Sequence, residues 1–535
     1  MAIRLAVFPA RDAGRLSQYG ASVWKGLAIY FKDSMPRLIL TFFLVVGAQN
    51  LQGSEGGPAL TVLPGAARFE LYLPSLRYAR VAVVAHAAST VTEGGQQIHL
   101  VDALQSKGIR VVKVFAPEHG FRSTASAGES VPNVRDPQTK LPIVSLYGNH
   151  KMPSEADLHD VDIVVFDLQD VGARFYTYIS TLSYVMQSCA EHQKPLIVLD
   201  RPNPNGTRID GPLLDTSKSK SFVGLHPVPV LYGMTIGEYG QMVQGEGWIP
   251  KADQLRMTVI PCRHYQRQQV ILPVPPSPNL TSPAAIFLYP SLCFFEGTPV
   301  SVGRGTDLPF EWVGAPWVPR GTSYFIPRAK VGAAEPLYER DTCFGENLQK
   351  IQMGYRMPLD LSILIRYFAL FEAQIQKDAE NTLARQAYKA RKKTREFELR
   401  KALQQDSNTF FQYNAAYDTL LLAHDTIGLP LDTSIPSGLN EPEKWTETDS
   451  TRFFPTPRIS KSTKARGFFW PFFSRLAGTP ALRISIEKGM SEQEIRAQWH
   501  RGLVDFKQKR RKYLLYPDVL VETSYESYTP LKSRK

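Results

Sequence analysis

The sequence predicts an α/β protein whose first domain is built on a parallel β-sheet with helices on both faces. Short continuous apolar runs, rich in Val and Ile, recur between residues 79 and 202, as buried parallel strands require. Stretches with helical periodicity separate these runs, which is typical of βαβ units. Polar and ionisable residues follow the runs, where the carboxyl ends of parallel strands form a ligand-binding edge.

The expected elements follow one another along the first half of the chain. Four apolar runs predict strands at residues 79–87, 109–117, 161–169 and 194–202. Helices are expected at residues 97–107 and 179–192 and from Thr235 onward, and a further strand near Met257–Ile260. Pro117 is expected to end the second strand because proline cannot donate to a ladder. We therefore expect one sheet domain over residues 49–260.

The texture of the chain changes near residue 261. Residues 271–320 are rich in Pro, Gly and aromatic side chains, so we place a domain boundary there and expect a C-terminal domain over residues 261–535. Within it, residues 376–465 look like an insertion: a basic helical stretch, 377–401, leads into a loop rich in Pro, Ser and Thr. Regular secondary structure is expected again from Ser491–Glu494, a capping box that predicts a helix running towards Lys512.

Composition excludes several classes of protein. The chain has 535 residues, 43% hydrophobic and 21% charged, which excludes a mostly disordered or collagen-like chain. Its four cysteines lie far apart, without a C-x-x-C pair, which excludes a disulfide scaffold and a zinc ribbon. The net charge of +12 suggests nucleic-acid binding as a function, but the chain contains no recognised nucleic-acid-binding module that supports it. We expect no nucleic-acid partner; an anionic wall or membrane surface explains the charge equally well.

The amino terminus has the pattern of an export signal. Residues 38–48 read LILTFFLVVGA, an apolar run too short to span a bilayer. Met35-Pro36-Arg37 precedes the run, and small residues end it near Ala48. We interpret residues 1–48 as a signal peptide region with Met35 as the true start; the alternative is a buried core helix. The protein is then exported, periplasmic or secreted, with no stable membrane span.

Polar side chains gather where the four predicted strands end. The first strand ends at His86, and the second runs into Glu118 and His119. The polar residues after the third and fourth strands are Asp167, Gln169, Asp170, Asp200, Arg201 and Asn203. Because these ends share one edge of a parallel sheet, we expect a binding crevice there. The alternative for each residue is a turn or helix-capping role.

The chain lacks the sequence motifs of several enzyme classes. No G-x-G-x-x-G follows the first strand, and the chain has no G-x-S-x-G and no H-E-x-x-H, which argues against a dinucleotide enzyme, a serine hydrolase and a zincin. Four of the strand-end residues could form a metal site, namely His86, His119, Asp167 and Asp200. Lone histidines in such places are more often hydrogen-bonding groups than ligands, so we expect no metal and no cofactor. A metal-dependent hydrolase or deacetylase stays an alternative.

The carboxylates point to glycoside hydrolysis. That reaction needs a proton donor for the leaving oxygen and a second group that acts on water, on the sugar or on its acetamide. Glu118 follows an apolar run, so burial would raise its pKa towards the working range of an acid. Glu129 and Glu296 are further candidates. The arginines Arg174, Arg201 and Arg304 could clamp an anion, or form internal salt bridges.

Long segments of the chain resemble the NamZ-like exo-β-N-acetylmuramidases. The most specific strings are VFDLQDVGARFYTYIS and VLDRPNPNG, joined by APEHGFRS, LPIVSLYG, GMTIGEY, YPSLCFFEGT, SVGRGTDLPFE, EQEIRAQW and KQKRRKYLLYPD. The resemblance covers roughly residues 78–365 and 470–518. It implies an exported enzyme of cell-wall turnover that releases N-acetylmuramic acid from non-reducing ends of peptidoglycan. It also implies a Rossmann-like domain, a smaller α+β C-terminal domain and a cleft between them.

The resemblance places the family's catalytic glutamate, in PEHG, on Glu118. We expect the catalytic group to be Glu118, His119, Asp167 and Asp200. The expected substrate-binding residues are His86, Glu129, Gln169, Asp170, Arg174, Tyr176, Arg201, Asn203, Asn205, Tyr232, Glu296 and Arg304. His86 and Tyr232 depart from the family, which usually has Asn and His there. A non-catalytic wall-glycan-binding protein is therefore a further alternative, and retaining, inverting and substrate-assisted mechanisms all stay open.

Overall fold

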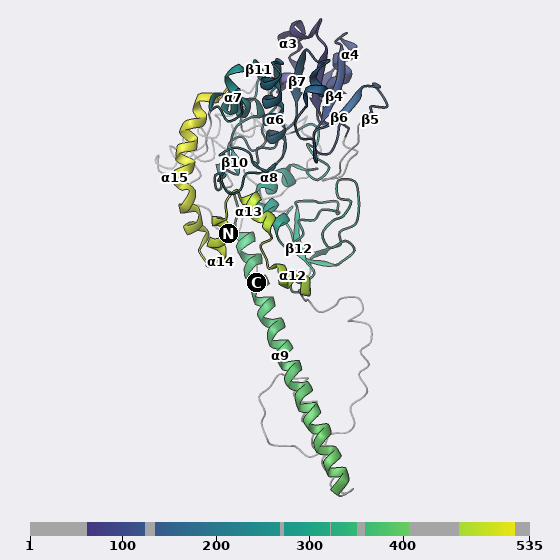
Figure 1. The fold of residues 1–535 in the computed structure, drawn as a ribbon, viewed down its shortest axis with the longest axis vertical. Helices are drawn as coiled ribbons and strands as arrows, with labels where there is room; N and C mark the ends of the chain where they lie inside the picture. Colours follow the sequence, from purple (N-terminus) through teal and green to yellow (C-terminus); the bar gives the residue numbers. More distant parts are fainter. Residues whose placement is uncertain are drawn as a thin grey trace, which may run out of the picture. The chain divides into compact units, whose positions relative to one another are not determined.

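The computed structural model describes residues 61–122, 134–267, 272–321, 323–349, 359–405 and 459–518. The strands of its main sheet are β1 (Val81–Ala85), β4 (Val111–Ala116), β5 (Val134–Arg135), β6 (Pro142–Ser145), β7 (Ile163–Asp167), β8 (Leu196–Leu199) and β11 (Met257–Ile260). Their order is β11-β8-β7-β1-β4-β6-β5 (Figure 1). Every pairing is parallel except that of β5 with β6. The predicted α/β class is thus confirmed.

Both faces of this sheet are covered by helices. Ala82 and Val84 of β1 belong to a core shared with α6 (Tyr178–Glu191) and α7 (Ile236–Gly245). Val81, Val83 and Ala85 belong to a second core with α3 (Phe69–Leu76) and α4 (Leu100–Ser106). Because side chains alternate along a strand, a strand buried on both faces must be apolar at every position. This is why β1 reads as the continuous run VAVVA.

The expected strands and helices are largely present, with one correction and several omissions. The helix expected at residues 97–107 is wrong at its start, because β3 (Gln96–His99) pairs with β2 (Thr90–Glu93) in a hairpin. Gly94 and Gly95 join the two strands with φ of 57° and 79°, the positive values that a two-residue hairpin turn needs. Strands β5 and β6 and helix α3 were not expected.

The second half of the chain extends the core that holds α6 and α7. It contributes α8 (Pro283–Leu292), α9 (Ser362–Gln405), α12 (Lys461–Arg466), α13 (Pro471–Ala477), α14 (Ala481–Glu487) and α15 (Glu492–Arg510). Small antiparallel pairings are β9 (Ile209–Asp210) with β10 (Leu231–Tyr232), and β14 (Cys343–Asn347) with β12 (Trp312–Ala315) and β13 (Tyr324–Phe325). Short 3-10 turns are η1 (Gly65–Ala67), η2 (Ala252–Gln254), η3 (Cys293–Gly297) and η4 (Arg511–Tyr513).

Other sequence predictions have mixed outcomes. The chain from Val62 onward groups into one compact unit, and the predicted division at residue 261 stays a prediction. The basic stretch 377–401 lies within α9, and the capping box of Ser491 and Glu494 opens α15 as expected. The signal region 1–48 and residues 425–458 of the predicted Pro-, Ser- and Thr-rich loop, which was expected to span 425–465, lie outside the described residues. The end of that prediction is wrong, because residues 461–465 are helical in α12. In the described ranges we find no helix long and apolar enough to cross a membrane.

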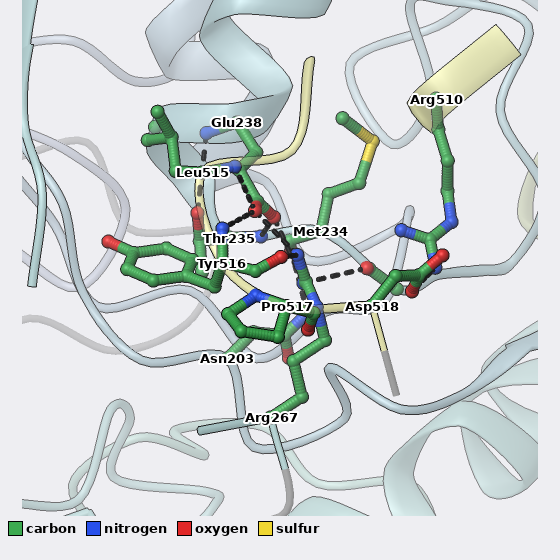
Figure 2. Close-up of polar contacts among 12 residues, drawn as sticks. Asn203, Met234, Thr235, Glu238, Arg267, Arg510, Leu515, Tyr516, Pro517 and Asp518 are labelled. Carbon is green, nitrogen blue, oxygen red and sulfur yellow. Dashed lines mark hydrogen bonds and ion pairs between the residues drawn. The ribbon is translucent and has the colours of Figure 1, made fainter. Parts of the chain in front are cut away.

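The end of the described chain returns to the sheet. After η4, the backbone N–H groups of Leu515 and Tyr516 donate to Oε1 of Glu238, at 2.8 and 3.3 Å. Glu238 lies in the first turn of α7 and forms a fully buried ion pair with Arg267. Figure 2 shows residues 515–518 running across this pair, with Asp518 beside Arg510 of α15. We call residues 515–518 the C-terminal strap.

Candidate active site

A pocket of about 450 Å³ lies beyond the carboxyl ends of β4 and β6. Its walls are the segments after these two strands, the start of α6, the loops near residues 222 and 278, α8 with η3, and α13. The polar side chains that line it include Glu118, His119, Tyr147, Lys151, Tyr176, Thr177, Ser277, Asn279, Glu296, Arg304 and Arg475. A volume of this size suits a small-molecule ligand.

Glu118 reaches this pocket from a tight turn at the end of β4. Strand β4 ends at Ala116, before Pro117 as expected, and His119 and Gly120 follow with φ of 71° and 76°. A positive φ is uncommon for a residue other than glycine. Such a conformation at a pocket wall is typical of functional sites, where surrounding contacts hold it in place.

The surroundings of Glu118 favour its protonated form. Oγ1 of Thr177 donates to Oε2 of Glu118 at 2.9 Å, and the Tyr147 hydroxyl forms a further hydrogen bond with the carboxyl. Burial of the carboxyl raises its pKa, while the Thr177 bond, the charge of Arg304 and the Tyr147 bond oppose that rise. The net shift is upward, because removal from water penalises the charged form most strongly. Glu118 can therefore hold a proton at a higher pH than an exposed glutamate.

A second carboxylate and a cation face the same pocket. Nε of Arg304 donates to Oε1 of Glu296 in an ion pair, and the guanidinium lies 5.0 Å from the centre of the Phe310 ring. Within the described residues, Nη1 of Arg304 is buried and has no hydrogen-bond partner. A buried donor without a partner is costly, so this nitrogen can donate to an anionic group of a bound ligand.

His119 and Tyr176 also lie at the pocket, as the sequence predicts. Nε2 of His119 is 3.3 Å from Oγ of Ser277, and the Tyr176 hydroxyl donates to the carbonyl of Pro276 at 2.8 Å. These two contacts connect the turn after β4 and the start of α6 to the loop that contains Pro276 and Ser277. Of the predicted site residues, the pocket brings together Glu118, His119, Tyr176, Glu296 and Arg304.

Asp167 and Arg201 do not line the pocket; they pair with each other. Nε and Nη2 of Arg201 contact the two carboxylate oxygens of Asp167 at 2.6 and 2.8 Å. Asp167 is fully buried and Arg201 nearly so. A buried charge needs such a partner, so this bidentate pair joins the ends of β7 and β8. The catalytic role expected for Asp167 and the substrate role expected for Arg201 find no support in this placement.

Asp200 is also an internal residue. It is fully buried and accepts hydrogen bonds from Thr235 Oγ1, Gly237 N and the Tyr516 hydroxyl, at 2.8, 2.8 and 2.5 Å. Burial raises the pKa of Asp200 to about 7. The carboxyl thus connects the end of β8 to the start of α7 and to the C-terminal strap, and it does not line the pocket.

The other expected binding residues are buried and serve the fold. His86 packs edge-on against Tyr178 at 4.9 Å between ring centres, and Tyr232 donates to Asp170. The remaining side chains donate to backbone carbonyls: Gln169 to Pro202, Arg174 to Pro212, Val228 and Leu476, Asn203 to Met234, and Asn205 to Val171. None of these seven side chains, Asp170 included, lines the pocket. Glu129 lies outside the described residues.

The burial of His86 affects its chemistry. Desolvation lowers the pKa of His86 well below its usual value, so the ring is neutral at physiological pH. The two departures from the family pattern, His86 and Tyr232, therefore lie in the packing behind the pocket. Among the described residues, no three or more His, Cys, Asp or Glu side chains are grouped so as to hold a metal ion.

Sequence reasoning missed several pocket residues. They are Tyr147, Lys151, Thr177, Phe222, Ser277, Asn279, Phe472 and Arg475. Tyr147 and Lys151 follow β6, so the rule that polar residues after strands form the site would have found them had that strand been expected. Phe472 and Arg475 come from α13, more than 320 residues after Lys151, and no pattern in their neighbourhood of the sequence indicates a site.

Comparison with known proteins places the chain beside one family. The profile described as exo-beta-N-acetylmuramidase NamZ, N-terminal, matches residues 81–284, and the C-terminal profile of the same name matches residues 287–419 and 446–516. The peptidoglycan beta-N-acetylmuramidase NamZ of Bacillus subtilis (strain 168) is 41% identical over 253 residues. This match covers 46% of the chain and 59% of that relative. The chain thus spans little more than half the length of the Bacillus subtilis protein.

Two solved structures have the same fold. Both are DUF1343 family proteins of Bacteroides fragilis. One has a TM-score of 0.62 at 34% identity, and the other a TM-score of 0.58 at 23% identity. Each comparison covers 86% of this chain and 100% of the other. The first supports the same overall architecture at appreciable sequence identity, and the second supports the fold alone.

Proposed function

The chain belongs to the exo-β-N-acetylmuramidase NamZ family, and from that membership we propose that it is a glycoside hydrolase that releases terminal N-acetylmuramic acid from peptidoglycan glycans. The observation that carries the proposal is Glu118: a carboxyl in a pocket, with a raised pKa and two side chains that donate to it. A glycosidase needs such an acid beside the leaving oxygen. The reaction serves cell-wall turnover.

In this proposal Glu118 donates its proton to the glycosidic oxygen. Thr177 and Tyr147 hold the carboxyl in place, and the departing sugar takes the proton as its C–O bond breaks. Glu296, held in its ion pair with Arg304, is the second carboxylate of the pocket. It either activates a water or attacks the sugar directly; in the third route the substrate's own acetamido group is the nucleophile. The separation of the two carboxyls in a complex decides between the first two routes.

Arg304 gives a reason for selectivity towards muramic acid. This sugar differs from N-acetylglucosamine by a lactyl ether that carries a carboxylate. Nη1 of Arg304 is a buried donor with no partner within the described residues, and a guanidinium matches a carboxylate in shape and charge. We propose that the lactyl carboxylate binds there. Export also belongs to this proposal, and it is supported by the apolar run at residues 38–48.

Turnover of chromogenic sugars tests the proposal. The protein is offered 4-nitrophenyl β-N-acetylmuramide and the matching β-N-acetylglucosaminide, each with and without EDTA. We expect release from the muramide only, insensitive to chelator. Hydrolysis of MurNAc-GlcNAc, whose sugar leaving group needs a proton, should fall about 10³-fold in Glu118→Gln, the scale of a lost general acid. Glu335→Gln, an exposed glutamate outside the pocket, is the matched control.

Each other outcome has a defined meaning. Sugar binding without release would identify a wall-glycan-binding protein. Activity abolished by EDTA would identify the metal-dependent hydrolase. Release from both sugars at similar rates would remove the role given to Arg304 while leaving the glycosidase intact.

A further inference from the structure

The open side of the pocket has a chemistry that the proposed reaction does not use. The lining side chains that are exposed or half-exposed there include Lys151, Phe222, Phe472 and Arg475. We call these four residues the pocket mouth. Tyr176 is buried, Glu118 and Arg304 are half-buried, and Phe472, which is 39% exposed, and Arg475 are exposed. The mouth is thus the part of the pocket that meets whatever extends from a sugar held inside.

The two cations of the pocket mouth, Lys151 and Arg475, can both bind an anionic group of a ligand. Among the described residues neither Lys151 nor Arg475 forms an ion pair or a hydrogen bond with a carboxylate, whereas Arg304 is paired with Glu296. Nζ of Lys151 lies 5.5 Å from the centre of the Phe222 ring, a cation–π contact that limits where the ammonium can go. Two positive charges at one opening, neither paired with a carboxylate in the part of the chain that the structure describes, attract a negatively charged group.

The two phenylalanines of the pocket mouth, Phe222 and Phe472, add an apolar contact surface for a ligand. Large apolar rings are normally buried, and partly exposed rings at the edge of a polar pocket mark a contact surface. A ring face packs well against the apolar face of a sugar. The pocket mouth therefore suits a carbohydrate that bears an anionic substituent, rather than a neutral sugar or a bare anion.

We propose that Lys151 and Arg475 form an anion subsite that binds a carboxylate on the leaving portion of the glycan. The inference rests on the proposed function. In a peptidoglycan chain the muramic sugar alternates with N-acetylglucosamine, and only the muramic sugar carries a lactyl carboxylate. When the terminal sugar occupies the pocket, the next carboxylate belongs to the leaving portion, two sugars along. An attached acidic peptide would present carboxylates in the same region.

The test compares two substrates, one without and one with the sugar that carries this carboxylate. MurNAc-GlcNAc has a neutral leaving sugar, and MurNAc-GlcNAc-MurNAc has a leaving disaccharide with a carboxylate. For the wild type we expect the higher kcat/KM on the trisaccharide, by about fivefold, the scale of two exposed ion pairs. The double variant Lys151→Met/Arg475→Met should lose this ratio, and about 0.5 M salt should reduce it in the wild type. A ratio of two rates on one protein is insensitive to the fraction folded.

A matched double variant, Lys488→Met/Arg501→Met, removes two exposed cations outside the pocket and should keep the wild-type ratio. A trisaccharide whose last muramic acid carries L-Ala-D-Glu separates the two carboxylate sources. A higher kcat/KM on it than on the plain trisaccharide assigns the subsite to peptide, and a lower one assigns it to the lactyl group. Equal losses on both substrates in Lys151→Met/Arg475→Met would overturn the subsite. If the wild type hydrolyses nothing, the proposed function fails, and calorimetric titration with the same two glycans still decides whether the subsite exists.

Discussion

Oγ1 of Thr177 lies 2.9 Å from Oε2 of Glu118 and donates a hydrogen bond to it. Thr177 is the residue that caps the start of α6, yet its side chain caps no backbone group of that helix. A threonine at this position ordinarily accepts a bond from the helix's own N–H groups. Here the hydroxyl contacts a carboxyl 59 residues earlier in the chain, which connects the helix to the turn after β4.

Loss of this hydrogen bond should move the pH profile. The Thr177 hydroxyl stabilises the charged form of Glu118 and so lowers its pKa. In Thr177→Val the pKa should rise further, so the acid stays protonated to higher pH. We expect the alkaline limb of kcat/KM on the muramide to shift to higher pH, with Thr177→Ser close to the wild type. A limb that shifts downward would contradict Glu118 as the general acid.

Substitution of Arg304 should reduce discrimination between sugars. In Arg304→Met the lactyl carboxylate loses its donor, so KM for the muramide should rise about tenfold or more, and preference over the glucosaminide should fall. Arg366→Met is the control, because Arg366 pairs with Glu346 at 2.6 Å away from the pocket. If preference for the muramide survives in Arg304→Met, its carboxylate is bound by another group.

Breaking the pair under the C-terminal strap should destabilise the fold. Glu238 and Arg267 are both fully buried, so Glu238→Gln leaves an uncompensated guanidinium in the interior. We expect a loss of about 3 kcal/mol in the free energy of unfolding, measured by denaturant titration. Glu487→Gln breaks an exposed pair with Arg483 and should cost under about 1 kcal/mol. Similar losses for the two variants would mean that the interior pair is no more important than a surface one.

Asp200 should make stability depend on pH. Burial raises the pKa of Asp200 from 3.8 to about 7, so the folded protein binds this proton more tightly than the unfolded chain does. The stability that the proton provides is complete below about pH 4 and is lost as the pH rises towards 7. Asp200→Asn cannot titrate, so its free energy of unfolding should fall less than that of the wild type between about pH 4 and 8. An identical slope in both proteins would show that Asp200 ionises normally.

Much of the fold was predictable because the sheet is buried on both faces. Strand β1 reads as an unbroken apolar run, and β7 is apolar up to Asp167. Their shortness and their Val and Ile content indicate buried strands. Strand β6 escaped because its burial is partial at Pro142 and Ser145. The hairpin of β2 and β3 escaped because its strands are short and half-exposed, so that only Gly94-Gly95 signalled the turn.

The candidate site was harder to predict, and the reason is physical. The edge-of-sheet rule correctly placed Glu118 and His119, but it treated every strand end alike. At the ends of β7 and β8 the charged groups instead hold parts of the fold together: Asp167 pairs with Arg201, and Asp200 accepts hydrogen bonds from Thr235 and Tyr516. A sequence shows which charges reach an edge, but their pairing depends on contacts between residues far apart. Arg475 illustrates the converse, since it reaches the pocket from a helix near the end of the chain.

The C-terminal strap has a consequence for biosynthesis. Its donors reach Glu238 across 277 and 278 residues of sequence, so these contacts form only after nearly the whole described chain has been made. Such distant contacts are slow to close. Until then the first turn of α7 holds a carboxylate that lacks two of its donors. Premature termination shortly before Leu515 should therefore yield a product that quality-control proteases remove, even though every pocket residue has already been translated.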